Sequence, residues 1–183
     1  MRHEIIMSGF GGQGVMVMGQ LLTYAGMLEN KKVTWMPSYG PEMRGGTANC
    51  SVIIADEPIG SPVISEATAA VIMNLPSLDR FEAAVKAGGV LIVNSSLIDK
   101  AVTRQDVKVY RVPINDIANE LGSVKMINMV ALGALLAAAG VVAEESVIAA
   151  FAKKFAAKPQ LIEVNQKALH QGWLFSRDHE PQI

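Results

Sequence analysis

Apolar blocks separated by short polar stretches predict a regular alternation of strands and helices along the chain. Six runs rich in aliphatic residues have the length of strands and end in turn residues such as Gly, Pro or Asp. These predicted strands cover residues 3–8, 32–36, 49–55, 70–73, 90–93 and 107–112. The last run alternates and is bordered by charged residues, which is typical of a strand near the edge of a sheet. Pro37 and Pro113 are expected to end the second and sixth strands.

Longer apolar segments predict five helices. They cover residues 15–28, 78–86 (started by residues 75–77), 126–139, 144–157 and 161–175. Gly88 and Gly89 are expected to close the second helix, and Gly140 the third. Residues 38–46 contain too many Gly and Pro for regular structure and form a long loop, and residues 178–183 are expected to be a frayed tail.

The segment 126–143 is apolar enough to raise the question of a membrane span, because Asn128 is its only polar side chain. A helix stopped by Gly140 has about 14 residues and a length of roughly 21 Å at about 1.5 Å per residue. The hydrocarbon core of a bilayer is about 30 Å thick. We therefore expect a helix buried in the protein core or at a subunit contact, and no membrane association.

Strands that alternate with helices predict the α/β class: a Rossmann-like, open, mostly parallel sheet flanked by helices, with a helical C-terminal part. A length of 183 residues suits one domain, residues 1–183. In such sheets ligands bind beyond the carboxyl ends of the strands. The two glycine-rich loops, after the first and second predicted strands, should both lie at that edge.

Composition narrows the class of protein. The net charge of −1 lacks the basic excess that binding to nucleic acid requires. The single cysteine forms no internal disulfide, and no secretory signal opens the sequence, so we expect a cytoplasmic protein. Half of the residues are hydrophobic, which is more than a lone domain of this size needs and indicates surface covered by partner subunits.

The first glycine loop has the chemistry of an anion site. Gly9, Gly11 and Gly14 show the spacing G-x-G-x-x-G between a predicted strand and a predicted helix, with Gly12 and Gln13 in the same turn. Such a turn lets backbone N–H groups and a helix N-terminus approach phosphate, although the same residues also suit a tight turn without a ligand. The acid that holds the ribose of a nicotinamide dinucleotide about 20 residues later is missing, and so is the lysine of an ATP-binding P-loop.

The second glycine-rich loop presents polar side chains in a frame of Pro and Gly. Arg44 could hold a carboxylate or phosphate, Glu42 could orient Arg44 or take a proton, and Tyr39 could stack or donate a hydrogen bond. A subunit contact and a solvated ion pair are the alternative interpretations.

Other candidate residues point to structure rather than chemistry. Cys50 heads an apolar strand and is expected to fill the core, and one cysteine cannot hold an iron–sulfur cluster. The three histidines lack metal-ligand spacing, so no metal site is predicted. Residues 94–96 are expected only to end a strand. No complete set of catalytic residues is visible.

Taken together, the motifs resemble the gamma subunit of the 2-oxoacid:ferredoxin oxidoreductases, and most closely the 2-oxoglutarate type, also called 2-oxoglutarate synthase. The similarity covers nearly the whole chain and rests on residues 9–14 (GFGGQG), 37–46 (PSYGPEMRGG), 49–54, 59–62 and 128–133. The two loops together are specific to the family, but relatives that act on pyruvate, branched-chain oxoacids or indolepyruvate share the fold and the GGQG turn.

This resemblance implies a subunit that is inactive alone, in a complex that decarboxylates a 2-oxoacid oxidatively to its acyl-coenzyme A and reduces ferredoxin. Thiamine diphosphate, Mg and iron–sulfur clusters would belong to alpha, beta and ferredoxin-like delta subunits. We expect the turn at residues 9–14, together with Arg44, to receive coenzyme A phosphates. Two other functions stay open: a free-standing nucleotide or acyl-coenzyme A binding module, and a purely structural assembly subunit.

Overall fold

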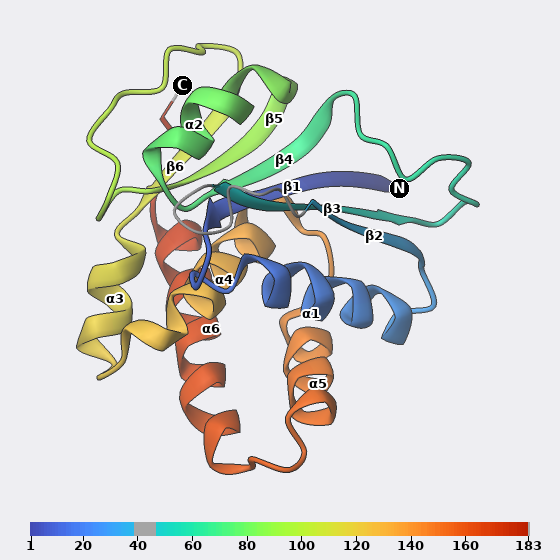
Figure 1. Ribbon diagram of the computed structural model, residues 1–183, viewed down its shortest axis with the longest axis vertical. Coiled ribbons are helices and arrows are strands. Elements are labelled where there is room, and N and C mark those ends of the chain that lie inside the picture. The colour runs from blue at the N-terminus through green and yellow to red at the C-terminus, as the bar shows by residue number, and fades with distance from the viewer. Residues whose placement is uncertain (39–46, 183) are drawn as a thin grey trace.

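The computed structural model describes residues 1–38 and 47–182 (Figure 1). The strands are β1 (Arg2–Phe10), β2 (Lys32–Ser38), β3 (Thr47–Ala55), β4 (Ala67–Ile72), β5 (Val85–Asn94) and β6 (Lys108–Val112). The helices are α1 (Val15–Leu28), α2 (Leu75–Phe81), α3 (Ile114–Glu120), α4 (Ile127–Ala139), α5 (Glu144–Lys154) and α6 (Gln160–Asp178), with short 3₁₀ turns η2 (Glu82–Ala84) and η3 (Val124–Met126).

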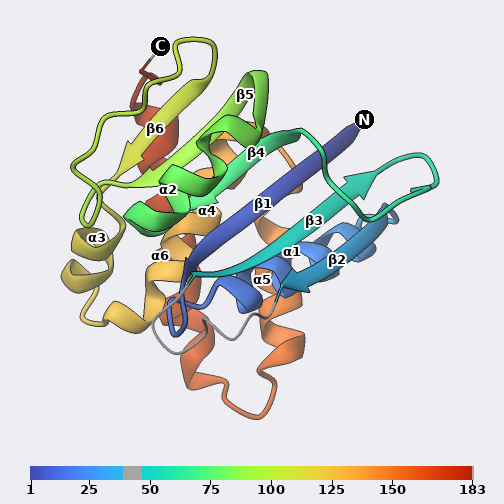
Figure 2. The ribbon, with the colours of Figure 1, turned by 45° about the horizontal axis from the view of Figure 1, so that its top comes forward.

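The six strands form one mixed sheet in the order β2-β3-β1-β4-β5-β6 (Figure 2). The neighbours β1, β4, β5 and β6 run parallel, while β3 is antiparallel to both β1 and β2. Residues 39–46 are too few for a parallel crossover, which takes about a dozen residues or more, so the chain returns as an antiparallel strand. The predicted α/β class, the mostly parallel sheet and the edge position of residues 107–112 are confirmed.

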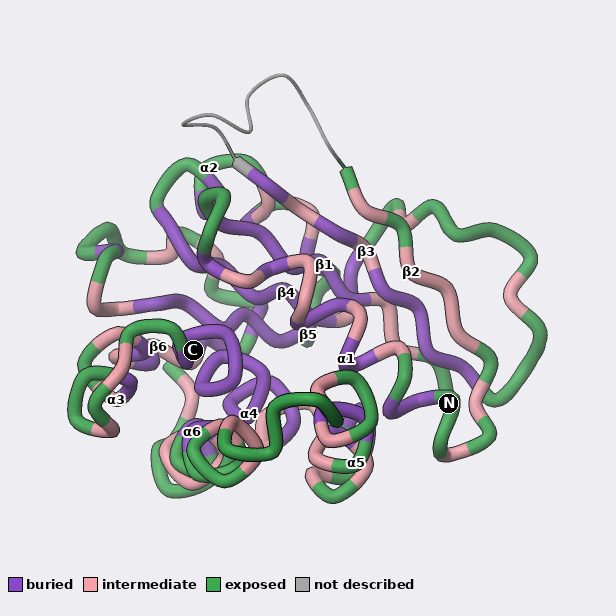
Figure 3. Tube along the Cα trace, turned by 60° about the horizontal axis from the view of Figure 1, so that its bottom comes forward, coloured by how far each residue is buried: buried purple, intermediate pink, exposed green. Residues whose placement is uncertain are grey.

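Helices cover the two faces of the sheet unequally. In Figure 1, α1 and α4 lie against one face with α5 and α6 outside them, and α2 alone lies on the other. The larger apolar core joins the sheet to α1, α4, α5 and α6, and the smaller one packs Leu78 of α2 against Ile6, Ala70 and Ile72. Buried segments therefore follow β1, β3, β4, β5 and α4 in Figure 3, whereas no residue of the edge strand β2 is buried and the outer turns of α5 and α6 are exposed.

The alanine-rich helix is buried nearly all round, as predicted. Residues 127–136 of α4 are all buried, and the helix ends at Gly140, whose φ of 58° is left-handed. Among the described residues, no helix combines the length and the apolar character that crossing a membrane requires. Where α4 crosses α6, the two backbones touch at Gly133 and Gly172: a Cβ at either glycine would lie 1.9 Å from a carbonyl oxygen of the other helix.

The predicted C-terminal end of the second helix, at residue 86, is wrong. Asn74 caps α2 by accepting a hydrogen bond from the Ser77 N–H at 2.9 Å, and the helix stops at Phe81. The Glu82 carboxylate instead accepts hydrogen bonds from Thr103 N at 2.6 Å and Arg104 N at 3.1 Å. Strand β5 follows from Val85, so the glycines at 88 and 89 lie in this strand and close no helix.

Helix α3 was missed by the sequence prediction, although its buried residues Ile114 and Ala118 have helical spacing. The residues expected only to end β5 also help to begin this helix. The Ser96 hydroxyl accepts hydrogen bonds from the N–H groups of Asn115 and Asp116, and Asn94 donates to Asn115.

Residues 178–182 are also more ordered than predicted. Helix α6 extends to Asp178, and Gln182 then pairs antiparallel with Val109 of the edge strand β6 through two backbone hydrogen bonds of 3.0 and 2.9 Å. The prediction of a frayed tail is therefore wrong. The segment is held because the edge of β6 offers it backbone hydrogen-bonding partners.

Several other bounds differ from the prediction by a few residues. Strands β4 and β5 begin earlier, at Ala67 and Val85, β2 continues through Pro37, which an edge strand tolerates, and α5 ends at Lys154.

Candidate functional site

The first glycine loop joins β1 to α1 at the carboxyl edge of the sheet, as predicted. Gly12 and Gly14 have left-handed φ values of 96° and 75°. The side chain of Gln13 ties the turn together: its Oε1 accepts a hydrogen bond from Phe10 N at 2.6 Å, and its Nε2 donates to Met73 O at 3.3 Å. The Gln13 amide thus holds the turn against the end of β4, and the exposed Gly11 and Gly12 present the loop's outer surface.

Gly9, the first glycine of the G-x-G-x-x-G spacing, lies before the turn and not in it. It lies inside β1, and a Cβ there would be 2.5 Å from Gln13 Oε1 and 2.8 Å from Met73 Cβ. Gly9 therefore makes room for the folded-back Gln13 side chain instead of forming the turn. The left-handed residue that begins α1 is Gly14.

The first N–H groups of α1 donate no hydrogen bond to a side chain of their own helix end. Gly14 is the N-cap residue, no described side chain accepts a hydrogen bond there, and the first turn contains no acidic residue. The first N–H groups of a helix lack intrahelical acceptors, and the helix dipole places partial positive charge at this end. This end of α1 therefore suits an anion.

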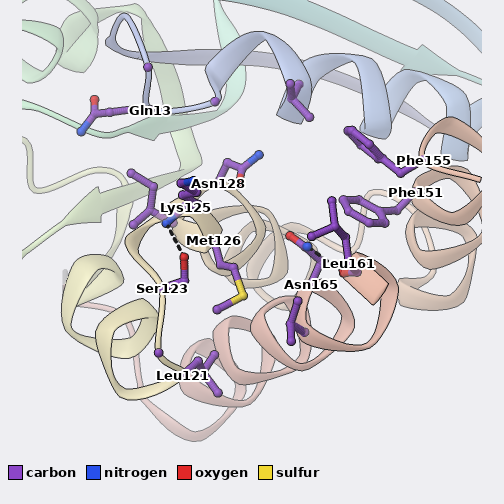
Figure 4. Close-up of a pocket in the computed structure, with 16 residues that line it drawn as sticks. Gln13, Leu121, Ser123, Lys125, Met126, Asn128, Phe151, Phe155, Leu161 and Asn165 are labelled. Atoms are coloured by element: carbon purple, nitrogen blue, oxygen red, sulfur yellow. Dashed lines mark hydrogen bonds between the residues drawn. The ribbon is translucent and has the colours of Figure 1, made fainter. Parts of the chain in front are cut away.

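A cavity of about 530 Å³ opens at this helix end (Figure 4). Its polar side is formed by the glycine turn, Ser123, Lys125 and Asn128, and its apolar side by residues of α1, α5 and α6 and the segment between the last two: Val17, Phe151, Phe155, Leu161 and Val164. The two phenylalanine rings lie with centroids 4.6 Å apart. A cavity of this size, apolar with a few convergent polar groups, is typical of a site for a small organic ligand.

Asn128, Lys125 and the two phenylalanines were not among the residues predicted to bind a ligand. The available signal was Asn128, the only polar side chain in an otherwise apolar run. Only 9 % of Asn128 is exposed, and a Cβ at Gly14 would lie 2.8 Å from its Cγ and Nδ2. Tertiary packing thus brings the start of α4 directly beneath the glycine turn.

The second glycine-rich loop departs from the same edge. Ser38 of β2 is paired with Asn49, and Thr47 of β3 is paired with Phe10 at the end of β1. The strand residues that flank this loop therefore lie beside the first glycine turn, as the sequence predicts. The candidate side chains of Tyr39, Glu42 and Arg44 lie outside the described residues.

Cys50 is a core residue, as predicted. Its thiol is fully buried beneath α1 and lies 3.5 Å from the carbonyl oxygen of Val15. Burial raises the pKa of the thiol to about 12, which leaves almost no thiolate near neutral pH. Within residues 1–38 and 47–182, no cluster of three or more His, Cys, Asp or Glu side chains has the arrangement of a metal site.

Comparison with known proteins agrees with this architecture. Residues 4–174 match the family model described as pyruvate ferredoxin/flavodoxin oxidoreductase. The 2-oxoglutarate synthase subunit KorC of Methanocaldococcus jannaschii is 39% identical over 150 residues, which cover 80% of each chain. Ketoisovalerate oxidoreductase subunit VorA of Methanothermobacter marburgensis is 37% identical over 171 residues, 92% of this chain, but this chain spans only 35% of that longer relative.

A solved structure shows the same fold over nearly the entire chain. The gamma subunit of the keto/oxoacid ferredoxin oxidoreductase from Geobacter sulfurreducens is 31% identical and superposes with a TM-score of 0.84, covering 97% of this chain and 99% of that one. The match therefore includes the sheet, the glycine turn and the C-terminal helices. On these grounds the chain belongs to the pyruvate ferredoxin/flavodoxin oxidoreductase family.

Proposed function

We propose that this chain is the gamma subunit of a cytoplasmic 2-oxoacid:ferredoxin oxidoreductase whose substrate is 2-oxoglutarate. The observation that carries the proposal is the similarity to a 2-oxoglutarate synthase subunit over 80% of both chains. In the reaction the 2-oxoacid loses carbon dioxide, coenzyme A receives the succinyl group, and oxidised ferredoxin takes up the electrons. Similarity to a ketoisovalerate oxidoreductase subunit makes branched-chain oxoacids the competing substrates.

The redox chemistry is assigned to partner chains. An iron–sulfur cluster usually takes four cysteine ligands, and the one cysteine here is buried with a raised pKa. Cys50 therefore does not fit such a cluster. We assign thiamine diphosphate, Mg and the clusters to alpha, beta and ferredoxin-like delta subunits. Exposed apolar side chains at the end of α1, namely Tyr24, Met27 and Leu28, support a surface that partner chains cover.

The role that we propose for this chain is to receive coenzyme A. The turn at residues 9–14 and the N-terminus of α1 offer backbone donors to its phosphates, and Arg44 supplies a positive charge from the neighbouring loop. Titration calorimetry of the assembled complex tests this role. We expect Arg44→Ala to weaken coenzyme A binding and to leave the affinity for the 2-oxoacid unchanged, whereas unchanged coenzyme A affinity would remove Arg44 from the site.

The assembly itself is tested by tagging this chain in its source cells and identifying the proteins recovered in equal amount. We expect a thiamine-binding pair and a cysteine-rich ferredoxin-like chain. The purified complex should then reduce ferredoxin with coenzyme A and 2-oxoglutarate faster than with pyruvate or 2-oxoisovalerate. Recovery of the chain alone, with tight nucleotide binding, would instead favour a free-standing binding module. Turn substitutions that alter assembly without altering kinetics would favour a purely structural subunit.

A further inference from the structure

The cavity beneath the glycine turn holds a polar group for which no described residue provides a partner. Asn128 lies in the first turn of α4, is nine-tenths buried and lines the cavity. Its amide makes no hydrogen bond to any residue that the structure describes. The residue is buried, but its amide atoms are not among the fully enclosed side-chain atoms without a partner, so the amide opens onto the cavity. An amide that faces a cavity and bonds to no described residue is free to bind a ligand there.

The groups around Asn128 indicate what kind of ligand this is. The uncapped N-terminus of α1 borders the cavity at Gly14, which the Asn128 side chain contacts. Among the described residues that line the cavity, only Lys125 is charged. Backbone N–H groups, an amide N–H and an ammonium group all favour an anion, and phosphate is the common ligand of a helix N-terminus.

The opposite wall of the cavity is apolar and aromatic. Phe151 of α5, Phe155 just after α5 and Leu161 of α6 lie on this side of the cavity (Figure 4), which Val164 also lines. A bare inorganic anion leaves this wall without a partner, whereas a ligand with a flat apolar group buries it. The matching chemical class is a phosphate attached to an aromatic base.

We propose that Asn128 is a ligand-binding residue whose side-chain amide, together with the N-terminus of α1, binds a phosphate group of a nucleotide that lies in this cavity against Phe151 and Phe155. Resting on the proposed function, this assigns the cavity to the nucleotide end of coenzyme A. The contact made by Asn128 differs from the one proposed for Arg44, because Asn128 approaches the phosphate from α4, in the helical layer below the turn. The competing explanation is that Asn128 only packs against Gly14 and spaces α4 from α1.

Replacement by aspartate separates the two explanations. Asn128→Asp keeps the size of the side chain, so packing against Gly14 is preserved. Its carboxylate is stabilised by the α1 dipole, so thermal stability should not fall. The same carboxylate occupies the N–H donors and repels the phosphate. We therefore expect coenzyme A affinity to fall by about tenfold or more, the size of effect typical when a hydrogen bond to a charged group is lost.

The experiment is titration calorimetry of coenzyme A into the assembled complex carrying wild-type, Asn128→Asp or Asn119→Asp chains, with thermal denaturation of each. Asn119 is exposed on α3 and does not line the cavity, so its variant adds the same charge outside the site. We expect an affinity within about twofold of wild type for that control. If Asn128→Asp prevents assembly, Asn128→Ala removes the amide without adding charge, and a weaker affinity is again expected.

The outcomes separate this inference from the proposed function. If wild-type and Asn128→Asp complexes bind coenzyme A equally well, Asn128 is a packing residue and only the present inference falls. An equal loss of affinity in Asn119→Asp would attribute the effect to overall charge and would also overturn it. If the wild-type complex binds no coenzyme A, both the inference and the proposed function fail.

Discussion

Replacement of Gly133 by alanine tests the closest approach between two helices in this fold. Gly133 faces Leu169 of α6, and the reciprocal Gly172 faces Val130 of α4. Helix propensity alone predicts a more stable protein, since alanine is favoured over glycine inside a helix by about 1 kcal/mol. Packing predicts the reverse, because the added methyl group meets backbone atoms that have no rotamer with which to move away.

The distances decide between these effects. A Cβ on Gly133 would lie 1.9 Å from the carbonyl oxygen of Leu169, whereas ordinary contact begins at 3.4 Å, so α4 and α6 must separate locally by about 1.5 Å. Overpacking a core costs about 1–3 kcal/mol and occasionally more. Because backbone obstructs the methyl group, the cost should reach about 3 kcal/mol at least, and the net loss after the gain in propensity is about 2 kcal/mol.

Thermal unfolding measures this loss. For a chain of this length, about 2 kcal/mol lowers Tm by roughly 4–8 °C. The control is Gly60→Ala, whose Cβ would meet no atom within 4 Å, so its Tm should stay within about 2 °C of wild type. A Gly133→Ala protein as stable as wild type, or more stable, would show that the helices do not approach as closely as the structure describes.

Three further predictions follow from the turn, the core and the surface. Gly14→Ala should lower the free energy of unfolding by about 2–4 kcal/mol, measured by chemical denaturation, because Gly14 has a left-handed φ of 75° and an added Cβ would lie 2.8 Å from Asn128. Unchanged stability would contradict this close approach. Burial raises the pKa of Cys50 to about 12, so iodoacetamide at pH 8 should alkylate Cys50 in the native protein about a thousandfold more slowly than it alkylates a free thiol. Unfolding should remove this protection, and rapid labelling of the native chain would refute the prediction. Hydrogen bonds from Lys31 and the N-terminus lower the pKa of Asp56 from 3.8 to about 2, so the stability that this carboxylate contributes is present above pH 4 and is lost as the pH falls towards 2. The difference in Tm between wild type and Asp56→Asn should therefore shrink between pH 4 and pH 2, and a constant difference would exclude this ion pair as its cause.

Local signals in the sequence determined most of the elements and their class. Strand 90–93, helix 15–28 and the buried alanine-rich helix are encoded by apolar runs with Gly or Pro at their ends, and these residues act on their neighbours in the chain wherever the segment lies. The glycine spacing at 9–14 placed a strand-to-helix turn at the carboxyl edge for the same reason. The motifs that resemble the 2-oxoacid:ferredoxin oxidoreductases likewise led to the family.

Only the tertiary structure decided how distant segments meet. The C-terminal residues are ordered because the edge of β6 offers Gln182 backbone partners, and no local pattern in residues 178–183 encodes that edge. The same holds for the candidate site. In the sequence Asn128 is only one polar residue in an apolar run, and it is tertiary packing that places it beside Gly14, more than a hundred positions earlier. Hydrophobic periodicity determines which face of a helix is buried, whereas contact between that face and a particular turn depends on the sheet order and on the close crossing of α4 and α6.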